Sequence, residues 1–273
     1  MSDPKIASAS LFVQPFTSSE EGAWSNAYLI GSSSEVILFD VPMLRGDAVK
    51  LADLIAGSGK QLTTVFISHA HPDHFMGSDL IADRFPMARF VSTGNVVADI
   101  EADGPWMLSM LQGKLGPDAP KRLVVPDVLS APAVQISANL LNVVEFGECE
   151  AKHIATLHIP DLKSLLAADL VYHDAHLYLQ ERHIDSWRVR LDELAIFARR
   201  NDILVLCPGH GAPAGPELID QTRNYLDAFA DAVQSGDPRD VERRMLVEYP
   251  EYHVKQFLTA FSIPAYFPSA SSA

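Results

Sequence analysis

Cysteine and basic residues are both scarce in this chain of 273 residues. It has two cysteines, Cys149 and Cys207, and 21 lysines and arginines against 35 aspartates and glutamates, for a formal net charge of −14. Two cysteines cannot form a disulfide framework, which favours a reducing compartment. An acidic surface repels phosphate backbones and anionic lipids, so we expect neither a nucleic acid nor a membrane as partner.

Long apolar runs are missing as well. No stretch approaches the roughly 20 apolar residues that a membrane-spanning helix needs. The N-terminal residues 1–5 do not show the basic residues and following apolar run of a signal peptide. We therefore expect a soluble, cytoplasmic protein. Hydrophobic residues make up 48% of the chain, and at this length they can form the core of a single domain that spans residues 1–273.

Histidines, in contrast, are concentrated in one short stretch. His69, His71, Asp73 and His74 directly follow the strand-like run 64–67. If the chain stays extended past this strand, His69 and His71 project to the same side, because side chains alternate with a period of two. Imidazole and carboxylate groups without a thiolate suit zinc, iron or manganese. The stretch therefore predicts a metal site at the end of a buried strand.

The order His-x-His-x-Asp-His after an apolar strand resembles the signature of the metallo-β-lactamase superfamily, a family of binuclear metallohydrolases. The resemblance can be followed from about Asn26 to His210. It implies an α/β fold, namely an αββα sandwich of two mixed sheets flanked by helices. It also implies two divalent metal ions, with zinc as the first expectation and iron or manganese as alternatives. It does not name the substrate.

The apolar periodicity along the chain is consistent with such a sandwich, because an antiparallel meander is followed by alternating helices and strands. We also expect a helical cover segment at about 99–130 and a helical C-terminal region at about 216–262. Strands are expected at 11–16, 26–31, 36–40, 65–67, 88–91, 122–125, 140–146, 153–159, 164–168 and 203–206. Helices are expected at 45–56, 75–85, 99–115, 187–199, 216–234, 239–247 and 252–261.

The resemblance implies three further metal ligands after the first motif. One is an aspartate that bridges the two metals and usually follows a glycine. Asp169 matches it at the end of an apolar strand, with Ala168 in place of the glycine. Another is a histidine after the last strand, which His210 matches in the step Pro-Gly-His-Gly.

At the remaining ligand the sequence departs from the family, which has a Gly-His step about twenty residues before the bridging aspartate. Here Gly147 is followed by Glu148, and we assign Glu148 to the position of the histidine. A carboxylate is a harder ligand than imidazole and tilts the preference towards manganese or iron. Glu150 lies on the same strand face and is the alternative in a register two residues later; Cys149 and then His153 are weaker candidates. A mononuclear site is a further hypothesis.

On this assignment a metal-bridging hydroxide would attack an ester, lactone or similar carbonyl substrate. The catalytic carboxylates would be Asp73, which orients the nucleophile or relays a proton, and the bridging Asp169. An iron-dependent redox member of the same fold and a β-lactam or thioester hydrolase are the alternatives. One metal would bind His69, His71 and Glu148, the other Asp73, His74 and His210.

We expect the substrate to be a small and largely apolar molecule. His173 and His176 closely follow Asp169, which would place them near the cleft as substrate contacts. The sequence leaves the oligomeric state open, with a homodimer as one hypothesis. Further apolar side chains are expected to line the cleft: Trp24, Phe75 and Met76, with Trp106, Met107 and Met110 from the cover segment.

Overall fold

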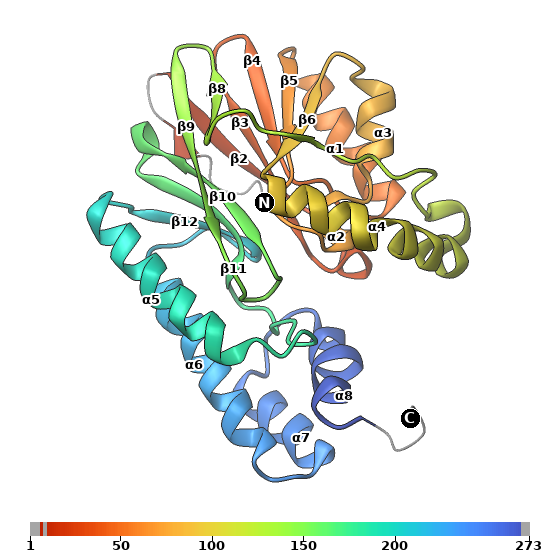
Figure 1. Cartoon of the computed structure of the whole chain (residues 1–273), viewed down its shortest axis with the longest axis vertical. Helices are drawn as coiled ribbons and strands as arrows, with labels where there is room; N and C mark the ends of the chain where they lie inside the picture. The colour runs from red at the N-terminus through yellow and green to blue at the C-terminus, as the bar shows by residue number, and fades with distance from the viewer. Residues whose placement is uncertain (1–5, 8–9, 269–273) are drawn as a thin grey trace.

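Two β-sheets packed face to face form the body of the protein, and helices cover their outer faces (Figure 1). The computed structural model describes residues 6–7 and 10–268, and within these residues one sheet has seven strands and the other five. Their strand orders are β1-β2-β3-β4-β5-β6-β7 and β12-β11-β10-β9-β8. This is the predicted αββα sandwich, and both sheets are mixed, because each contains antiparallel and parallel pairs.

The first half of the chain builds the larger sheet. Its first four strands form an antiparallel meander, and three parallel strands extend it. Parallel neighbours need a crossover connection, and helices provide each of these. The strands are β1 (Ile6–Ala7), β2 (Phe12–Thr17), β3 (Asn26–Gly31), β4 (Glu35–Phe39), β5 (Gln61–Phe66), β6 (Arg89–Ser92) and β7 (Asp127–Val128). The crossover helices are α1 (Arg45–Gly57), α2 (Pro72–Phe75), α3 (Ser78–Arg84) and α4 (Gly94–Leu115).

The second half builds the smaller sheet, in which four antiparallel strands are joined by one parallel strand after helix α5. Helices α5 and α6 pack on β11, and α6 to α8 extend beyond one end of the sandwich, in blue in Figure 1. The strands are β8 (Ala133–Ile136), β9 (Asn139–Phe146), β10 (Ile154–Ile159), β11 (Ser164–Tyr172) and β12 (Val205–His210). The helices are α5 (Ile184–Arg200), α6 (Glu217–Val233), α7 (Pro238–Glu248) and α8 (Ile263–Tyr266), with short turns at Glu20–Gly22, Gly116–Asp118 and Pro160–Leu162 and a π-helix at Phe257–Ser262.

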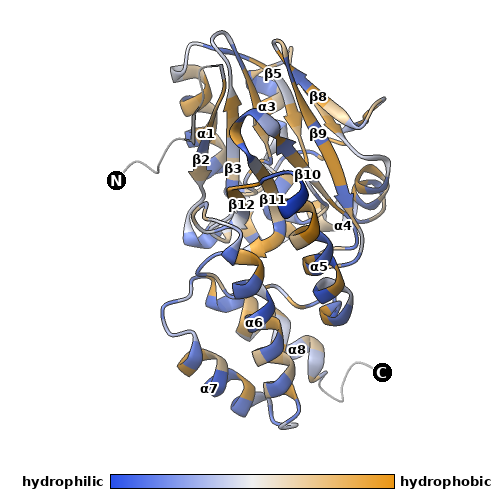
Figure 2. Cartoon of the chain, turned by 90° about the vertical axis from the view of Figure 1, so that its left-hand side faces the viewer, coloured by the Kyte–Doolittle hydropathy of each residue, from blue (hydrophilic) through white to orange (hydrophobic). Residues whose placement is uncertain are grey.

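Central strands are buried on both faces, which explains their continuous apolar sequences. Every residue of β3, β10 and β11 is buried. In Figure 2 these strands are largely orange, while helices α5 and α6 alternate between orange and blue. Burying each Leu, Ile or Val side chain contributes about 1.5–3 kcal/mol. A polar side chain inside such a strand therefore needs partners or a ligand.

Three predicted elements differ in the structure. The strand predicted at 122–125 is wrong, because Leu123 packs against α4 at Gly104 and the pairing with β6 begins only at Asp127. The helix predicted at 75–85 is interrupted at Gly77, where a Cβ atom would lie 2.1 Å from the Pro42 carbonyl oxygen. The helix predicted at 252–261 is a β-bridge at His253 followed by the π-helix.

Within residues 6–7 and 10–268, each helix is too short or too polar to cross a bilayer.

Candidate metal centre

The segment 69–74 turns sharply at the end of β5. His71 has an extended backbone, with φ −91° and ψ 141°, and Pro72 occupies the first position of α2. Proline suits this position because the first helical N–H has no partner within the helix. The rings of His69 and His71 lie 4.9 Å apart, and the helical turn then presents Asp73 and His74. Local geometry alone thus brings four ligand groups together.

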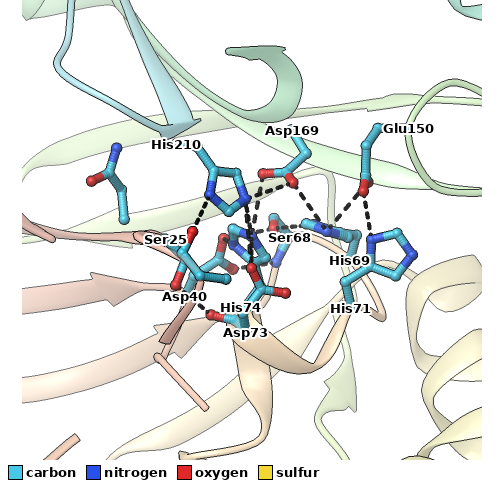
Figure 3. Close-up of polar contacts among 12 residues, drawn as sticks. Ser25, Asp40, Ser68, His69, His71, Asp73, His74, Glu150, Asp169 and His210 are labelled. Atoms are coloured by element: carbon cyan, nitrogen blue, oxygen red, sulfur yellow. Dashed lines mark hydrogen bonds and ion pairs between the residues drawn. The ribbon is translucent and has the colours of Figure 1, made fainter. Parts of the chain in front are cut away.

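Two triads of buried side chains face each other at this edge of the sandwich (Figure 3). The first triad is His69, His71 and Glu150; the second triad is Asp73, His74 and His210. In each triad the ligand atoms all lie within 4.8 Å of one another.

Asp169 lies between the triads. Its Oδ2 atom is 3.1 Å from His210 Nε2 and 4.0 Å from His69 Nε2, and its Oδ1 atom is 3.2 Å from His74 Nε2. Tyr172 donates a hydrogen bond of 2.6 Å to Oδ2, which fixes the carboxylate. Asp169 therefore lies within reach of both triads, and its role as a bridging ligand stays a prediction.

A bulge in β11 aims Asp169 at the triads. The register between β11 and β12 shifts on both sides of Ala168, whose φ is +48°. An L-residue in this left-handed conformation costs roughly 1–2 kcal/mol, which explains why a glycine is usual at this step in the family. Bulges often re-aim side chains at functional sites.

Gly209 leaves room for Asp169. A Cβ atom on Gly209 would lie 1.6 Å from Asp169 Oδ1, whereas a Cβ atom on the exposed helical Gly113 would contact nothing within 4 Å. Overpacking a buried position costs roughly 1–3 kcal/mol, so Gly209→Ala is expected to lower the free energy of unfolding by about this amount. Gly113→Ala is the control and should raise it by roughly 0.5–1 kcal/mol. Chemical unfolding curves measure both; equal stability of the two variants would contradict this packing.

The structure corrects the assignment of Glu148. Its side chain is exposed, whereas Glu150 is 2% exposed and places Oε1 2.8 Å from His71 Nδ1 and Oε2 3.6 Å from His69 Nε2. The prediction was wrong by two residues because β9 ends at Phe146 and the following residues turn instead of alternating. Cys149 and His153 have other partners: the Cys149 thiol faces the Ala151 carbonyl, and His153 pairs with Asp99 at 2.7 Å.

The donor atoms of these side chains fit a cation. Four buried atoms have no hydrogen-bond partner although they converge on one region: His69 Nε2, Asp73 Oδ2, Glu150 Oε2 and Asp169 Oδ1. In addition, the Nε2 atoms of His74 and His210 lie only 3.4 Å apart. A buried polar atom without a partner costs about 1–3 kcal/mol, and cations between the triads would satisfy all of these atoms. Nitrogen and oxygen donors suit zinc, iron or manganese.

Each of the four histidines is held by its other ring nitrogen, an arrangement typical of metal ligands. Their partners are a hydroxyl, two carboxylates and a backbone carbonyl. The pairs are His69 Nδ1 with Ser68 Oγ at 2.8 Å, His74 Nδ1 with Asp40 Oδ2 at 3.0 Å, His210 Nδ1 with Ala23 O at 2.9 Å, and His71 Nε2 with Glu181 Oε1 at 3.0 Å.

Asp40 and Glu181 were missed by sequence analysis. Asp40 is 1% exposed and also accepts hydrogen bonds of 2.7 Å from the backbone N–H and the hydroxyl of Ser68. An ionisable residue that ends the apolar run 36–40 was the signal that could have identified it. For Glu181, 110 residues after His71, the sequence holds no comparable signal.

Burial and neighbouring charges shift the protonation of these groups. Burial by itself raises the pKa of Asp73, but His74 and His210 lower it to about 2. Burial likewise opposes ionisation of Asp169, yet the same two imidazoles hold its pKa well below the ordinary value. Burial and the adjacent His74 lower the pKa of His69. Burial opposes protonation of His71 and His74, yet Glu150 and Asp169 respectively hold the pKa of these imidazoles well above the ordinary value. A metal would have to displace these protons, because imidazole binds metals in its neutral form.

The two sheets are joined directly beside the centre. The Asn26 amide donates to the carbonyls of Pro208 at 3.0 Å and Gly211 at 2.6 Å, and Tyr28 donates to Pro208 O at 2.7 Å. These bonds fix the segment that carries His210 against β3.

Several of the predicted substrate contacts are buried or have other partners, and Trp24 as a substrate contact stays a prediction. His176 is buried and pairs with the Tyr225 hydroxyl at 2.8 Å, and His173 pairs with the Ala212 carbonyl at 2.7 Å. Phe75 and Met76 are 1% and 2% exposed and belong to the core. Their placement follows from the fold, because α2 is buried and its polar residues Asp73 and His74 are enclosed as well. Trp24 is half-buried, and its ring stacks on His253 at 3.8 Å.

Helix α4, in the expected cover segment, contacts the loop that carries Glu150. Asp99 pairs with His153 at 2.7 Å and with Lys152 at 3.5 Å. Trp106 is 66% exposed, whereas Met107 and Met110 are half-buried against the core. That this helix covers a substrate stays a prediction.

Comparison with known proteins agrees with this geometry. Residues 25–210 match the family model described as the metallo-beta-lactamase superfamily. VMB-1 at pH 5.5 is 14% identical, with a TM-score of 0.63 over 84% of this chain and 98% of that one. DIM-1 metallo-beta-lactamase is 15% identical, with a TM-score of 0.62 over 83% and 98%. A metallo-beta-lactamase from Pontibacter korlensis is 15% identical, with a TM-score of 0.63 over 81% and 96%. At such identities the likeness concerns the fold, and a comparison with curated proteins gave no match.

Proposed function

Because the chain belongs to the metallo-β-lactamase superfamily, whose family model matches residues 25–210, we propose that it is a metal-dependent hydrolase of an ester, lactone or similar carbonyl substrate. The observation that supports this most directly is the pair of buried triads joined by Asp169, with unpartnered donor atoms facing each other.

Two divalent cations held by these residues would supply a water that ionises near neutral pH and would polarise the substrate's carbonyl oxygen. Asp73 Oδ2 is buried and has no hydrogen-bond partner, and it lies 3.5 Å from the Nε2 atoms of His74 and His210. From there it can orient the attacking water or accept its proton. Burial of the surrounding side chains keeps bulk water away from the reacting groups.

The metals that we propose are two zinc ions per chain. Four imidazoles and three carboxylates are a donor set that zinc accepts, and Glu150 in place of a family histidine makes iron or manganese the next candidates. Metal analysis of protein purified without added metal tests this proposal. Two zinc ions per chain are expected; a coloured iron protein would favour the redox alternative.

Turnover of a substrate panel tests the reaction itself. The panel contains an ester, a lactone, a thioester, a phosphodiester and a β-lactam. We expect carbonyl substrates to be hydrolysed and the phosphodiester to react poorly, because the net charge of −14 repels anions. A β-lactam belongs in the panel because metallo-beta-lactamases are among the proteins with a similar fold. Absence of turnover on all five by the metal-loaded protein would overturn the proposal.

Glu181 is expected to strengthen metal binding through His71. Its Oε1 atom lies 3.0 Å from His71 Nε2, so it orients the ring with Nδ1 towards Glu150. Loss of such a partner typically weakens metal binding roughly 10- to 100-fold. We expect the metal affinity of Glu181→Ala to be lower than that of the wild type by a factor in this range. The affinity of Glu181→Gln should lie between those of Glu181→Ala and the wild type.

Competition with a coloured chelator measures these affinities. Asp185→Asn is the matched control, because Asp185 is nearby but pairs with Arg188 and its side chain is 98% exposed. Unchanged affinity in Glu181→Ala would show that the bond to His71 does not support the metal.

A further inference from the structure

The C-terminal region returns to the metal centre. The ring of Phe257 lies 5.2 Å from that of His210, edge-on at 79°. Phe257 comes after residue 210, where the family match ends. This part of the chain therefore adds to the site a side chain that the family motifs do not account for.

Two further rings continue from Phe257. Tyr178 lies 5.4 Å from Phe257, 5.5 Å from Phe261 and 5.1 Å from the ring of His71. We refer to Tyr178, Phe257 and Phe261 as the aromatic wall. It contacts one histidine of each triad, and its outer end is open, because Phe261 is 37% exposed while Phe257 is 8% exposed.

Hydrogen bonds fix both ends of the segment that carries Phe257 and Phe261. At one end, the Glu20 carboxylate accepts hydrogen bonds from the Val254 N–H at 2.8 Å and from His253 Nδ1 at 3.2 Å. At the other end, Ser262 Oγ accepts from the Leu179 N–H at 2.9 Å and donates to the Leu177 carbonyl at 3.1 Å.

Between these anchors the chain forms a π-helix, Phe257–Ser262. A π-helix has wider turns than an α-helix and is frequently found at functional sites. Here it places two aromatic residues of consecutive turns against the same partner, Tyr178. The wall is therefore preorganised rather than formed on binding, which lowers the entropy lost by a ligand that stacks on it.

We propose that the aromatic wall binds a ring-bearing apolar part of the substrate, so that aryl-alkyl esters or lactones are the preferred class. Aromatic pairs contribute attraction beyond the area they bury, and Phe261 offers exposed ring surface at the outer end of the wall. The carboxylates of Glu150 and Glu181 near His71 disfavour an anionic group there. This inference rests on the proposed hydrolase function, but it can be tested without turnover.

Binding of two carboxylates, the products of the corresponding esters, provides the test. Calorimetry on metal-loaded protein compares 4-phenylbutyrate with butyrate. We expect wild-type protein to bind 4-phenylbutyrate about tenfold more tightly, as one well-packed ring allows. In Phe261→Ala this ratio should fall to about twofold, and Phe261→Tyr should retain it.

Val247→Ala is the control, because Val247 is an apolar side chain on α7, 72% exposed and outside the wall. Trp106→Ala tests the competing site on α4. A wild-type ratio near one, or a ratio that persists in Phe261→Ala, would refute binding of the phenyl ring at the aromatic wall.

Hydrolysis of the two methyl esters is measured in parallel. If neither these esters nor any substrate of the panel is hydrolysed while the ratio depends on Phe261, the hydrolase proposal fails and the wall stands. If substrates are hydrolysed but the ratio does not depend on Phe261, only the role of the wall is refuted.

Discussion

Replacing Asp169 by alanine is expected to abolish hydrolysis and to lower the metal content of the purified protein. Asp169 reaches His74, His210 and His69 with its two oxygens, so its loss removes the one carboxylate that lies between the two triads. Metal ions supply several kcal/mol of transition-state stabilisation, which corresponds to a loss of roughly 10³-fold or more in kcat/KM.

Steady-state kinetics and metal analysis of Asp169→Ala measure the two effects. Asp161→Ala is the control, because Asp161 lies in the exposed turn that precedes β11 and outside the triads. Circular dichroism confirms that each variant is folded. An active Asp169→Ala protein with its full metal content would refute the bridge, and a wild-type protein that carries one metal at full activity would refute the binuclear site.

Glu150→Gln and Glu148→Gln are expected to behave in opposite ways. Glu150 is buried, and one of its oxygens has no hydrogen-bond partner, whereas Glu148 is exposed. The amide of glutamine cannot supply the negative charge that a cation beside His69 and His71 attracts. We expect Glu150→Gln to lose about 100-fold or more in kcat/KM, since even loss of an outer partner of a ligand costs 10- to 100-fold. Glu148→Gln should stay within about twofold, as for surface substitutions generally.

The pair of variants provides its own control, because the two substitutions are chemically identical and lie two residues apart. Metal content measured on both proteins separates a loss of ligand from a loss of folding. If Glu148→Gln were inactive and Glu150→Gln active, the register in this loop would be the one that the sequence first indicated. Glu150→His restores the family's ligand type, and we expect it to keep more activity than Glu150→Gln.

The first motif could be predicted from the sequence because its geometry is local. His69, His71, Asp73 and His74 depend only on a strand end, a two-residue alternation and a proline that begins a helix. Asp169 and His210 could be located because the resemblance to the family implies one ligand at the end of an apolar strand and another after the last strand, and both strands are visible in the sequence.

The position of Glu150 depended on the tertiary structure. Strand alternation ends at Phe146, and the next residues follow a turn whose course is set by hydrogen bonds such as that from the Cys149 N–H to the Ala151 carbonyl. In a turn, sequence spacing no longer tells which side chain faces inward. The family pattern gave the correct loop, and only the packing of that loop against His71 selected the residue.

The sequence by itself indicated the fold class, the chemistry of the ligands and six of the positions around the centre. The four positions of the first motif follow from the periodicity of consecutive residues, and the fold class and the other two positions follow from the resemblance to the family. The tertiary structure alone decided which further side chains surround that centre. Asp40 is 34 residues away from its partner His74 in the sequence, and Glu181 is 110 residues away from its partner His71. Tyr178 of the aromatic wall also contacts His71 from a distant part of the sequence. Such contacts arise when sheets and helices pack, and burial in the packed state, rather than residue type, makes a carboxylate or a ring part of the site.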